Sequence, residues 1–275
     1  RALRGPSRRT PRKKYIITPN GDKVIDFGQN ITGRERVRLR GKQGDTVRIF
    51  HAEVLDKNGE FYTKNLRSAK ATSTYILSGE EEWIAPLFSF YGFRYIKVEG
   101  IKGDLNLNDF IAEAISSNIP QRGTFITSDS TINQLQSNIV WGMVDNYVDI
   151  PTDCPQRNER LGWTGDAQMF FRTATFNRDV QTFFNKWLAD LQADQLENGG
   201  IMGCVPRVHD NRISAGWADA ATIIPWQHYM AYGDTRILER QYASMKKWVD
   251  YISSVAENHL WSKGNSYGDW LYFNY

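Results

Sequence analysis

The feature that most constrains the fold is a change in hydrophobic period near residue 120. Before it, residues 36–40 (RVRLR) alternate strictly between polar and apolar, and turn sequences such as 56–59 (DKNG) recur at short intervals. After it, apolar residues follow the three-to-four spacing of a helix, as at Ile132, Leu135, Ile139 and Met143. One element cannot satisfy both periods, so the sequence predicts a β domain followed by an α domain.

The length allows both domains to have a core, because the chain has 275 residues and 41% of them are hydrophobic. Residues 14–117 are expected to form an antiparallel, jelly-roll-like β-sandwich. Residues 118–275 are expected to form about five helices. Their predicted limits are a start capped at 128–130, a helix from 164 or 165 to 176, one opening at 179, one over 217–232 that is kinked or broken at Pro225, and one over 235–257.

The stretch 151–168 (PTDCPQRNERLGWTGDAQ) is a loop between two of these helices. It concentrates carboxylates, arginines, a tryptophan and breakers of regular structure, and functional residues gather on such loops. Paired carboxylates can donate and accept protons, while an indole offers an apolar face to the C–H side of a sugar ring. The loop therefore suits glycosidic bond cleavage, although a solvated, salt-bridged loop explains the same residue types equally well.

Other features of the sequence favour no further chemistry. Two cysteines, Cys154 and Cys204, give neither a disulfide framework nor a C-x-x-C metal motif, and no metal or cofactor is expected. Residues 1–13 are read as a basic tail or linker rather than a nucleic-acid-binding arm, because no aromatic residue interleaves with the charges. No stretch is apolar enough to span a membrane, and the sequence does not indicate the compartment.

The run 153–166 (DCPQRNERLGWTGD) resembles the signature of the bacterial α-L-rhamnosidases, glycoside hydrolase family 78. The family pattern, close to D-C-P-Q-R-(D/N)-E-R-x-G-W-x-G-D, is intact, with Asn158 at its variable position. The runs IDFGQNITGRERVRLRG, HAEVLDKNGEFY and FYGFRYIKVEG resemble the β-sandwich domain of the same family. GWADA and YGDWL resemble motifs of its catalytic domain.

The resemblance implies a fold and an activity. Family members fold the second domain as an (α/α)6 barrel of twelve helices, so residues 118–275 are expected to be the first half of one, in a chain that is a fragment. The implied reaction removes terminal α-L-rhamnose from a rhamnose-containing glycoside or polysaccharide with inversion of configuration. The expected partners are that substrate and the remainder of the barrel.

The resemblance also assigns roles within the signature. Glu159 is the implied general acid, and the general base is implied to lie beyond Tyr275. Asp153, Arg157 and Asp166 are expected to bind rhamnose hydroxyls. The expected aromatic walls of the pocket are Trp163, Trp217 and Trp270. We predict that Arg157 and Arg160 face other acceptors, which would leave Glu159 able to keep a proton near neutrality.

Two alternatives remain open from the sequence alone. A carbohydrate-binding protein without catalysis would keep the same pocket, and the absence of the implied base from these residues is compatible with it. A nucleic-acid binder has only the basic N-terminal run in its favour.

Overall fold

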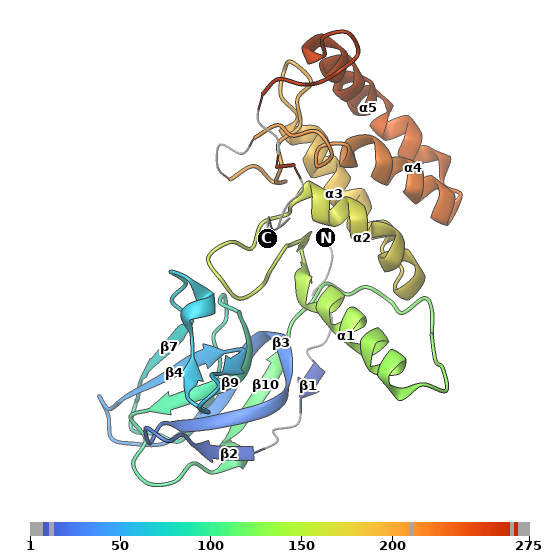
Figure 1. Cartoon of the computed structure of the whole chain (residues 1–275). Helices are drawn as coiled ribbons and strands as arrows, with labels where there is room; N and C mark the ends of the chain where they lie inside the picture. The colour runs from blue at the N-terminus through green and yellow to red at the C-terminus, as the bar shows by residue number, and fades with distance from the viewer. Residues whose placement is uncertain (1–7, 11–13, 209–211, 265–266, 269–275) are drawn as a thin grey trace.

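The computed structural model describes residues 8–10, 14–208, 212–264 and 267–268. It contains a β domain and an α domain (Figure 1), and each has a buried apolar cluster of its own. The predicted order, an antiparallel β domain followed by helices, is confirmed. None of the helices in these ranges combines the length and the apolar character that crossing a membrane requires.

The β domain is one antiparallel sheet of eight strands, which pair in the order β1-β10-β3-β9-β4-β7, with β2 and β8 also pairing with β3. The strands are β1 (Arg8–Thr10), β2 (Lys14–Ile17), β3 (Lys23–Leu39), β4 (Thr46–Ala52), β7 (Thr72–Ile76), β8 (Glu82–Ile84), β9 (Tyr91–Glu99) and β10 (Phe110–Ala114). A separate hairpin joins β5 (Val54–Leu55) and β6 (Phe61–Tyr62), and short 3-10 turns lie at η1 (Lys64–Leu66) and η2 (Leu107–Asp109).

The long strand β3 organises this domain. It contains 24–27 and most of 36–40, which the sequence predicted as two separate strands. Its pairing with β9 shifts register between Asp26 and Ile31. Gly28 lies in that shift with a φ of 75°, a conformation that glycine adopts without strain. Gly28 therefore marks a bulge within one continuous strand. The first half of β3 pairs with β2, and the second half pairs with β10 and β8.

Three residues of the segment expected to be a basic tail join the sheet. Arg8–Thr10 forms β1 and pairs antiparallel with β10 over 112–114. The physical reason is that β10 would otherwise present an unpaired backbone edge on that side.

The α domain contains α1 (Ser130–Asn146), α2 (Thr164–Asn177), α3 (Gln181–Asp194), α4 (Ala220–Tyr232) and α5 (Thr235–Val255). The Asp129 side chain caps α1 and the Asp234 side chain caps α5, as the sequence indicated. Pro225 was expected to kink or break its helix, yet α4 continues through it. The helix begins only five residues earlier, so the backbone hydrogen bond that proline removes belongs to the first turns.

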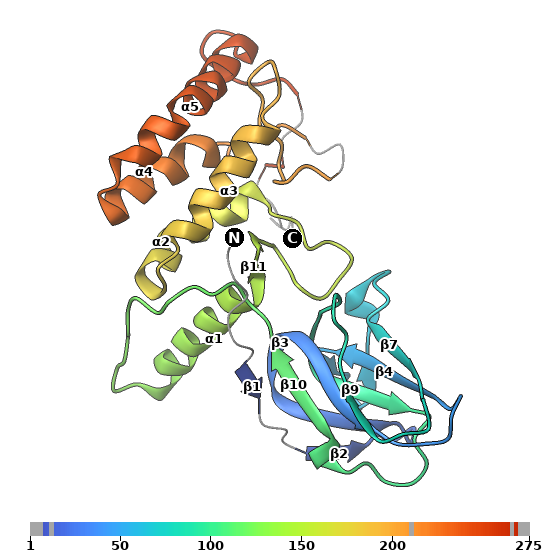
Figure 2. The same ribbon diagram turned by 180° about the vertical axis from the view of Figure 1, so that it is seen from behind.

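Helix α1 lies between the two domains and packs on both (Figures 1 and 2). Trp141 packs against the apolar cluster of the β domain, whereas Met143 belongs to that of the α domain. After α1, a short hairpin leads into the loop 152–163. Its two strands, β11 (Tyr147–Val148) and β12 (Ile150–Pro151), have two residues each. In both views this loop projects from the helices toward the β domain.

Candidate active site

The signature loop is fixed at its base by Asp153. The backbone N–H of Asp153 donates to the carbonyl of Leu161 at 3.0 Å, and its Oδ1 accepts from the N–H of Leu161 at 3.0 Å. These reciprocal bonds close the loop across eight residues. At the far end, the N–H and the hydroxyl of Thr164 both donate to the carbonyl of Gly203, which anchors the start of α2.

The loop, α2 and the segments around Trp217 and Tyr267 enclose a cavity of about 400 Å³. Its lining residues are Arg67, Asp153, Arg157, Glu159, Trp163, Asp166, Trp217 and Tyr267. Six of the seven residues predicted for the site therefore lie together: Glu159, Asp153, Arg157, Trp163, Asp166 and Trp217. The seventh, Trp270, lies outside the described residues.

Glu159 faces three hydrogen-bond donors within this cavity. Trp163 Nε1 donates to Glu159 Oε1 at 3.0 Å. Arg157 donates to Oε2 from Nε at 3.0 Å and lies 2.9 Å away through Nη2. Arg67 Nη1 donates to the same oxygen at 3.2 Å. The carboxyl group is therefore held with Oε2 against two guanidinium groups and Oε1 against the indole.

The expectation that both arginines face other acceptors is correct for Arg160 and wrong for Arg157. Arg160 Nη1 donates to the carbonyl of Phe90 at 3.2 Å. The Arg157 guanidinium contacts Glu159 and also Asp153 Oδ2, at 3.5 Å. Burial within a cluster of carboxylates explains its orientation, because one cation lowers the repulsion between two neighbouring anions.

The other two carboxylates have perturbed acidity. Burial is the main cause that raises the pKa of Asp153, and the charge of Glu159 adds to it. Asp166 is exposed as a residue, yet desolvation of its carboxyl, followed by the charges of Asp153 and Glu159, raises its pKa as well. Such shifts are typical of carboxylates that share a functional cavity.

The aromatic residues form a continuous wall. Tyr267 packs edge-on against Trp163, with ring centroids 5.5 Å apart, and lies 4.9 Å from Trp217. A Cβ atom added at Gly165 would lie 2.7 Å from the Trp217 ring, so Trp217 rests directly on the first turn of α2. The wall and the three carboxylates line the same cavity.

Arg67 and Tyr267 also line the cavity and were not predicted from the sequence. Tyr267 belongs to the YGDWL run that resembles a family motif, so that run was a signal for it. Arg67 comes from the β domain, 92 residues before Glu159, and no local pattern marks it.

Asp153, Cys154 and Glu159 each offer a ligand atom within 4.8 Å of the others, a spacing that could hold a metal ion. The Arg157 guanidinium already contacts both carboxylates there. Burial raises the pKa of the Cys154 thiol to about 11, which disfavours the thiolate that a metal would need. These residues therefore do not fit a cation.

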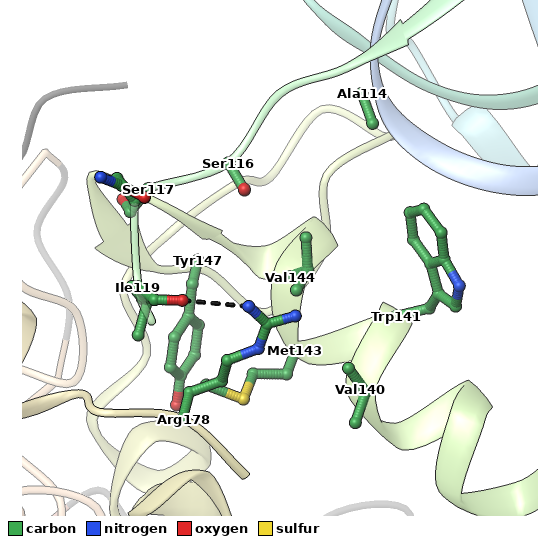
Figure 3. Close-up of a pocket in the computed structure, with 11 residues that line it drawn as sticks. Ala114, Ser116, Ser117, Ile119, Val140, Trp141, Met143, Val144, Tyr147 and Arg178 are labelled. Atoms are coloured by element: carbon green, nitrogen blue, oxygen red, sulfur yellow. Dashed lines mark hydrogen bonds between the residues drawn. The ribbon is translucent and has the colours of Figure 1, made fainter. Parts of the chain in front are cut away.

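A second cavity, of about 160 Å³, lies between α1 and the segment that enters the α domain (Figure 3). Arg178 closes one side of it by donating from Nη1 to the carbonyl of Ile119 at 3.0 Å. No carboxylate is among its lining residues, so it does not suit acid–base chemistry.

Comparisons with known proteins agree with this geometry. A family model described as the bacterial α-L-rhamnosidase six-hairpin glycosidase domain matches residues 120–274. This chain belongs to the bacterial α-L-rhamnosidase family. A second model, the concanavalin-like domain of bacterial α-L-rhamnosidase, matches residues 16–116. The resemblance first seen in the signature loop thus extends over both domains of this chain.

Individual relatives carry the same name. An α-L-rhamnosidase of Formosa agariphila is 44% identical over 94% of this chain. The crystal structure of Streptomyces avermitilis α-L-rhamnosidase complexed with L-rhamnose is 40% identical, with a TM-score of 0.93 over 97% of this chain. The α-L-rhamnosidase structure from Dictyoglumus thermophilum is 35% identical, with a TM-score of 0.89 over 94% of this chain.

The chain is short beside these relatives. It covers 28% of the Formosa protein, 26% of the Streptomyces chain and 30% of the Dictyoglumus chain.

Proposed function

We propose that this chain provides the proton-donating side of an α-L-rhamnosidase active site, with Glu159 as the general acid. The observation that carries the proposal is that Glu159 lies in a cavity with two further carboxylates and two tryptophans, on a chain whose relatives are named α-L-rhamnosidases. The Streptomyces relative binds L-rhamnose, and we extend that ligand to this cavity.

The hydrogen bonds indicate which oxygen of Glu159 delivers the proton. Oε2 faces the guanidinium groups of Arg67 and Arg157, so a proton on that oxygen would oppose two positive charges. Oε1 faces only the indole N–H of Trp163 among its hydrogen-bond partners in the described residues. We therefore assign Oε1 as the oxygen that protonates the glycosidic oxygen as the bond to rhamnose breaks.

The remaining residues of the cavity suit binding of the sugar ring. Asp153, Asp166 and Arg157 can hydrogen-bond hydroxyl groups, and Trp163 and Trp217 can pack against its C–H face and its C6 methyl group. An apolar pocket distinguishes one such methyl group only by about 1–3 kcal/mol, so the polar contacts must supply the rest of the selectivity.

Asp153 is too close to Glu159 to act as the base of an inverting enzyme. Their nearest carboxylate oxygens lie within 4.8 Å, whereas inverting enzymes keep the two carboxyl groups roughly 6.5–9.5 Å apart to admit water. We propose that the base belongs to the part of the full-length protein that this chain does not contain, in further helices that complete an (α/α)6 barrel. The 275-residue chain alone is then expected to bind rhamnose without turning it over.

The experiment uses the full-length protein and the variant Glu159→Gln, with Glu239→Gln on the exposed side of α5 as the matched control. Loss of a general acid should lower kcat about 10²–10⁴-fold on an alkyl α-L-rhamnoside. The loss should be much smaller on 2,4-dinitrophenyl α-L-rhamnoside, whose leaving group needs little protonation. The control should match the wild type on both substrates.

Other outcomes would overturn the proposal. Equal losses on both substrates would remove the acid role from Glu159. A first-formed product with the α configuration, observed by proton NMR, would exclude inversion. A full-length protein that binds rhamnose and hydrolyses neither substrate would be a carbohydrate-binding protein.

A further inference from the structure

Arg67 is the residue of the β domain that reaches the Glu159 carboxyl. It follows the 3-10 turn η1, and its guanidinium lies 3.2 Å from Glu159 Oε2. Its side chain is 56% exposed, while that of Glu159 is 19% exposed. The cavity is therefore lined by both domains, and the β domain supplies a positive charge beside the proposed acid.

The backbone of Arg67 is strained. Its φ is 57° and its ψ is −121°, a region that residues with a side chain rarely adopt. Such conformations cost about 1–3 kcal/mol and persist at functional sites where the surroundings impose them. A glycine would fit this backbone better, so stability alone does not account for an arginine at this position.

The signature loop is joined to the β domain by alternate residues. Asn158 Nδ2 donates to Ser68 Oγ at 2.7 Å, next to Arg67 in the chain. Arg160 donates to the carbonyl of Phe90, and its guanidinium carbon lies 5.1 Å from the Phe90 ring centre. Asn158 and Arg160 bind the β domain, whereas Arg157 and Glu159, which alternate with them, line the cavity. The contact between Arg67 and Glu159 is thus flanked by two contacts that join the signature loop to the β domain.

We propose that Arg67 is a positioning residue that holds Glu159 Oε2, so that Oε1 remains turned toward the glycosidic oxygen. This inference rests on the proposed function and extends it by making the β domain part of the catalytic geometry. Arg67 acts through Glu159, and its removal leaves Arg157 as the remaining described partner of Oε2, while Trp163 still contacts Oε1.

The charges that face Glu159 in the described residues set the expected pH response. The guanidinium groups of Arg67 and Arg157 contact Glu159 Oε2, and the carboxyl groups of Asp153 and Asp166 line the same cavity. Replacing Arg67 with a neutral residue removes one of the two cations beside Oε2, and this change favours the neutral carboxyl over the carboxylate. The protonated enzyme should then persist further into the alkaline range.

The test compares Arg67→Met, Arg67→Lys and Arg67→Gly in the full-length protein, with Arg48→Met on the exposed side of β4 as the control. Arg67→Met should lower kcat on the alkyl rhamnoside roughly 3- to 10-fold, with KM nearly unchanged. Its alkaline limb of kcat/KM should move to higher pH. Arg67→Lys should restore most of the rate and the position of the limb, because it retains the charge.

Arg67→Gly separates positioning from folding. It should lower kcat as Arg67→Met does, while its melting temperature should exceed that of Arg67→Met because the backbone strain is relieved. Wild-type kcat and an unmoved alkaline limb in Arg67→Met would overturn the inference. So would equal losses in Arg67→Met and Arg67→Lys.

Failure of the inference differs from failure of the proposed function. If Glu159→Gln loses activity in the leaving-group-dependent way while Arg67→Met behaves like the wild type, only the role of Arg67 is refuted. If Glu159→Gln is fully active, both are refuted.

Discussion

Asp145 Oδ1 accepts a hydrogen bond of 2.8 Å from the backbone N–H of Thr32, and this bond ties α1 to β3. Burial raises the pKa of Asp145 to about 7, against the effect of this hydrogen bond, and the charge of Glu53 adds to the rise. When the pKa of a carboxyl is higher in the folded state than in the unfolded state, ionisation of that carboxyl lowers the free energy of unfolding. The joint between the domains is therefore sensitive to pH.

We expect the stability of the full-length protein to fall as the pH rises from about 4 to 7, by up to about 1.4 kcal/mol per pH unit from this group. Asp145→Asn keeps an acceptor for the Thr32 N–H and cannot ionise. It should equal the wild type near pH 4 and be more stable at pH 8, measured by urea denaturation. Asp250→Asn, on the exposed part of α5, should not diverge from the wild type in this way between pH 4 and pH 8. A pH-independent difference between Asp145→Asn and the wild type would show that Asp145 does not cause the pH dependence.

The buried pair of His51 and Glu35 makes a second prediction, on stability. Both side chains are fully buried, with His51 Nε2 2.8 Å from Glu35 Oε2, and Tyr75 donates to Glu35 Oε1 at 2.6 Å. Burial opposes ionisation of Glu35, yet the hydrogen bond and charge of His51, helped by the hydroxyl groups of Ser73 and Tyr75, lower its pKa. The pair therefore stabilises the fold at pH values above the pKa of an unfolded glutamate. This stabilisation is lost as the pH falls below that value and through the lower pKa of Glu35 in the folded protein.

Glu35→Gln should destabilise the β domain by about 3–5 kcal/mol at pH 7, because it removes one partner of a buried pair. The difference should shrink in acid, where the wild type loses the same contribution. Glu99→Gln is the control, since Glu99 is exposed and its pair with Lys97 is worth about 1 kcal/mol at most. Thermal unfolding at pH 7 and at pH 3, below the pKa of an unfolded glutamate, distinguishes Glu35→Gln from Glu99→Gln. A loss under 1 kcal/mol in Glu35→Gln would contradict the prediction.

Gly165 tests whether Trp217 is a wall of the active site. Alanine normally stabilises a helix relative to glycine by about 0.5–1 kcal/mol. At Gly165 the new Cβ would lie 2.7 Å from the Trp217 ring, so the indole must move. We expect Gly165→Ala to lower kcat/KM on rhamnosides roughly tenfold. Gly142→Ala in α1, where nothing lies within 4 Å, should raise stability and leave the kinetics unchanged. An unaltered kcat/KM in Gly165→Ala would remove Trp217 from the site.

The helices were predictable because their signals are local. Asp129 and Asp234 cap the helices that their positions indicated, and the buried face of α3 is the one that the apolar spacing predicted. The β domain was harder. Strand β10 was not expected, and β3 was expected as two strands, because pairing partners lie far apart in the chain and a glycine can mark either a turn or a bulge.

The site shows the same division. The signature loop indicated five of the lining residues, because all of them lie within fourteen positions of one another. Arg67 could not be found in that way, since its proximity to Glu159 depends on how the two domains meet. The orientation of Arg157 was predicted wrongly for a related reason. A sequence shows which charges are near one another, but the direction of a side chain depends on the buried carboxylates around it.

The alternation along residues 157–160 limits how the two domains of this chain can be recombined with those of other proteins. Odd positions serve the cavity and even positions serve the joint, so inserting or deleting one residue would exchange the two sets. A chimaera that takes its β domain from a distant homologue must also inherit the matching partners at 67, 68 and 90. The two domains of this chain are thus exchangeable only together, even though each has a core of its own.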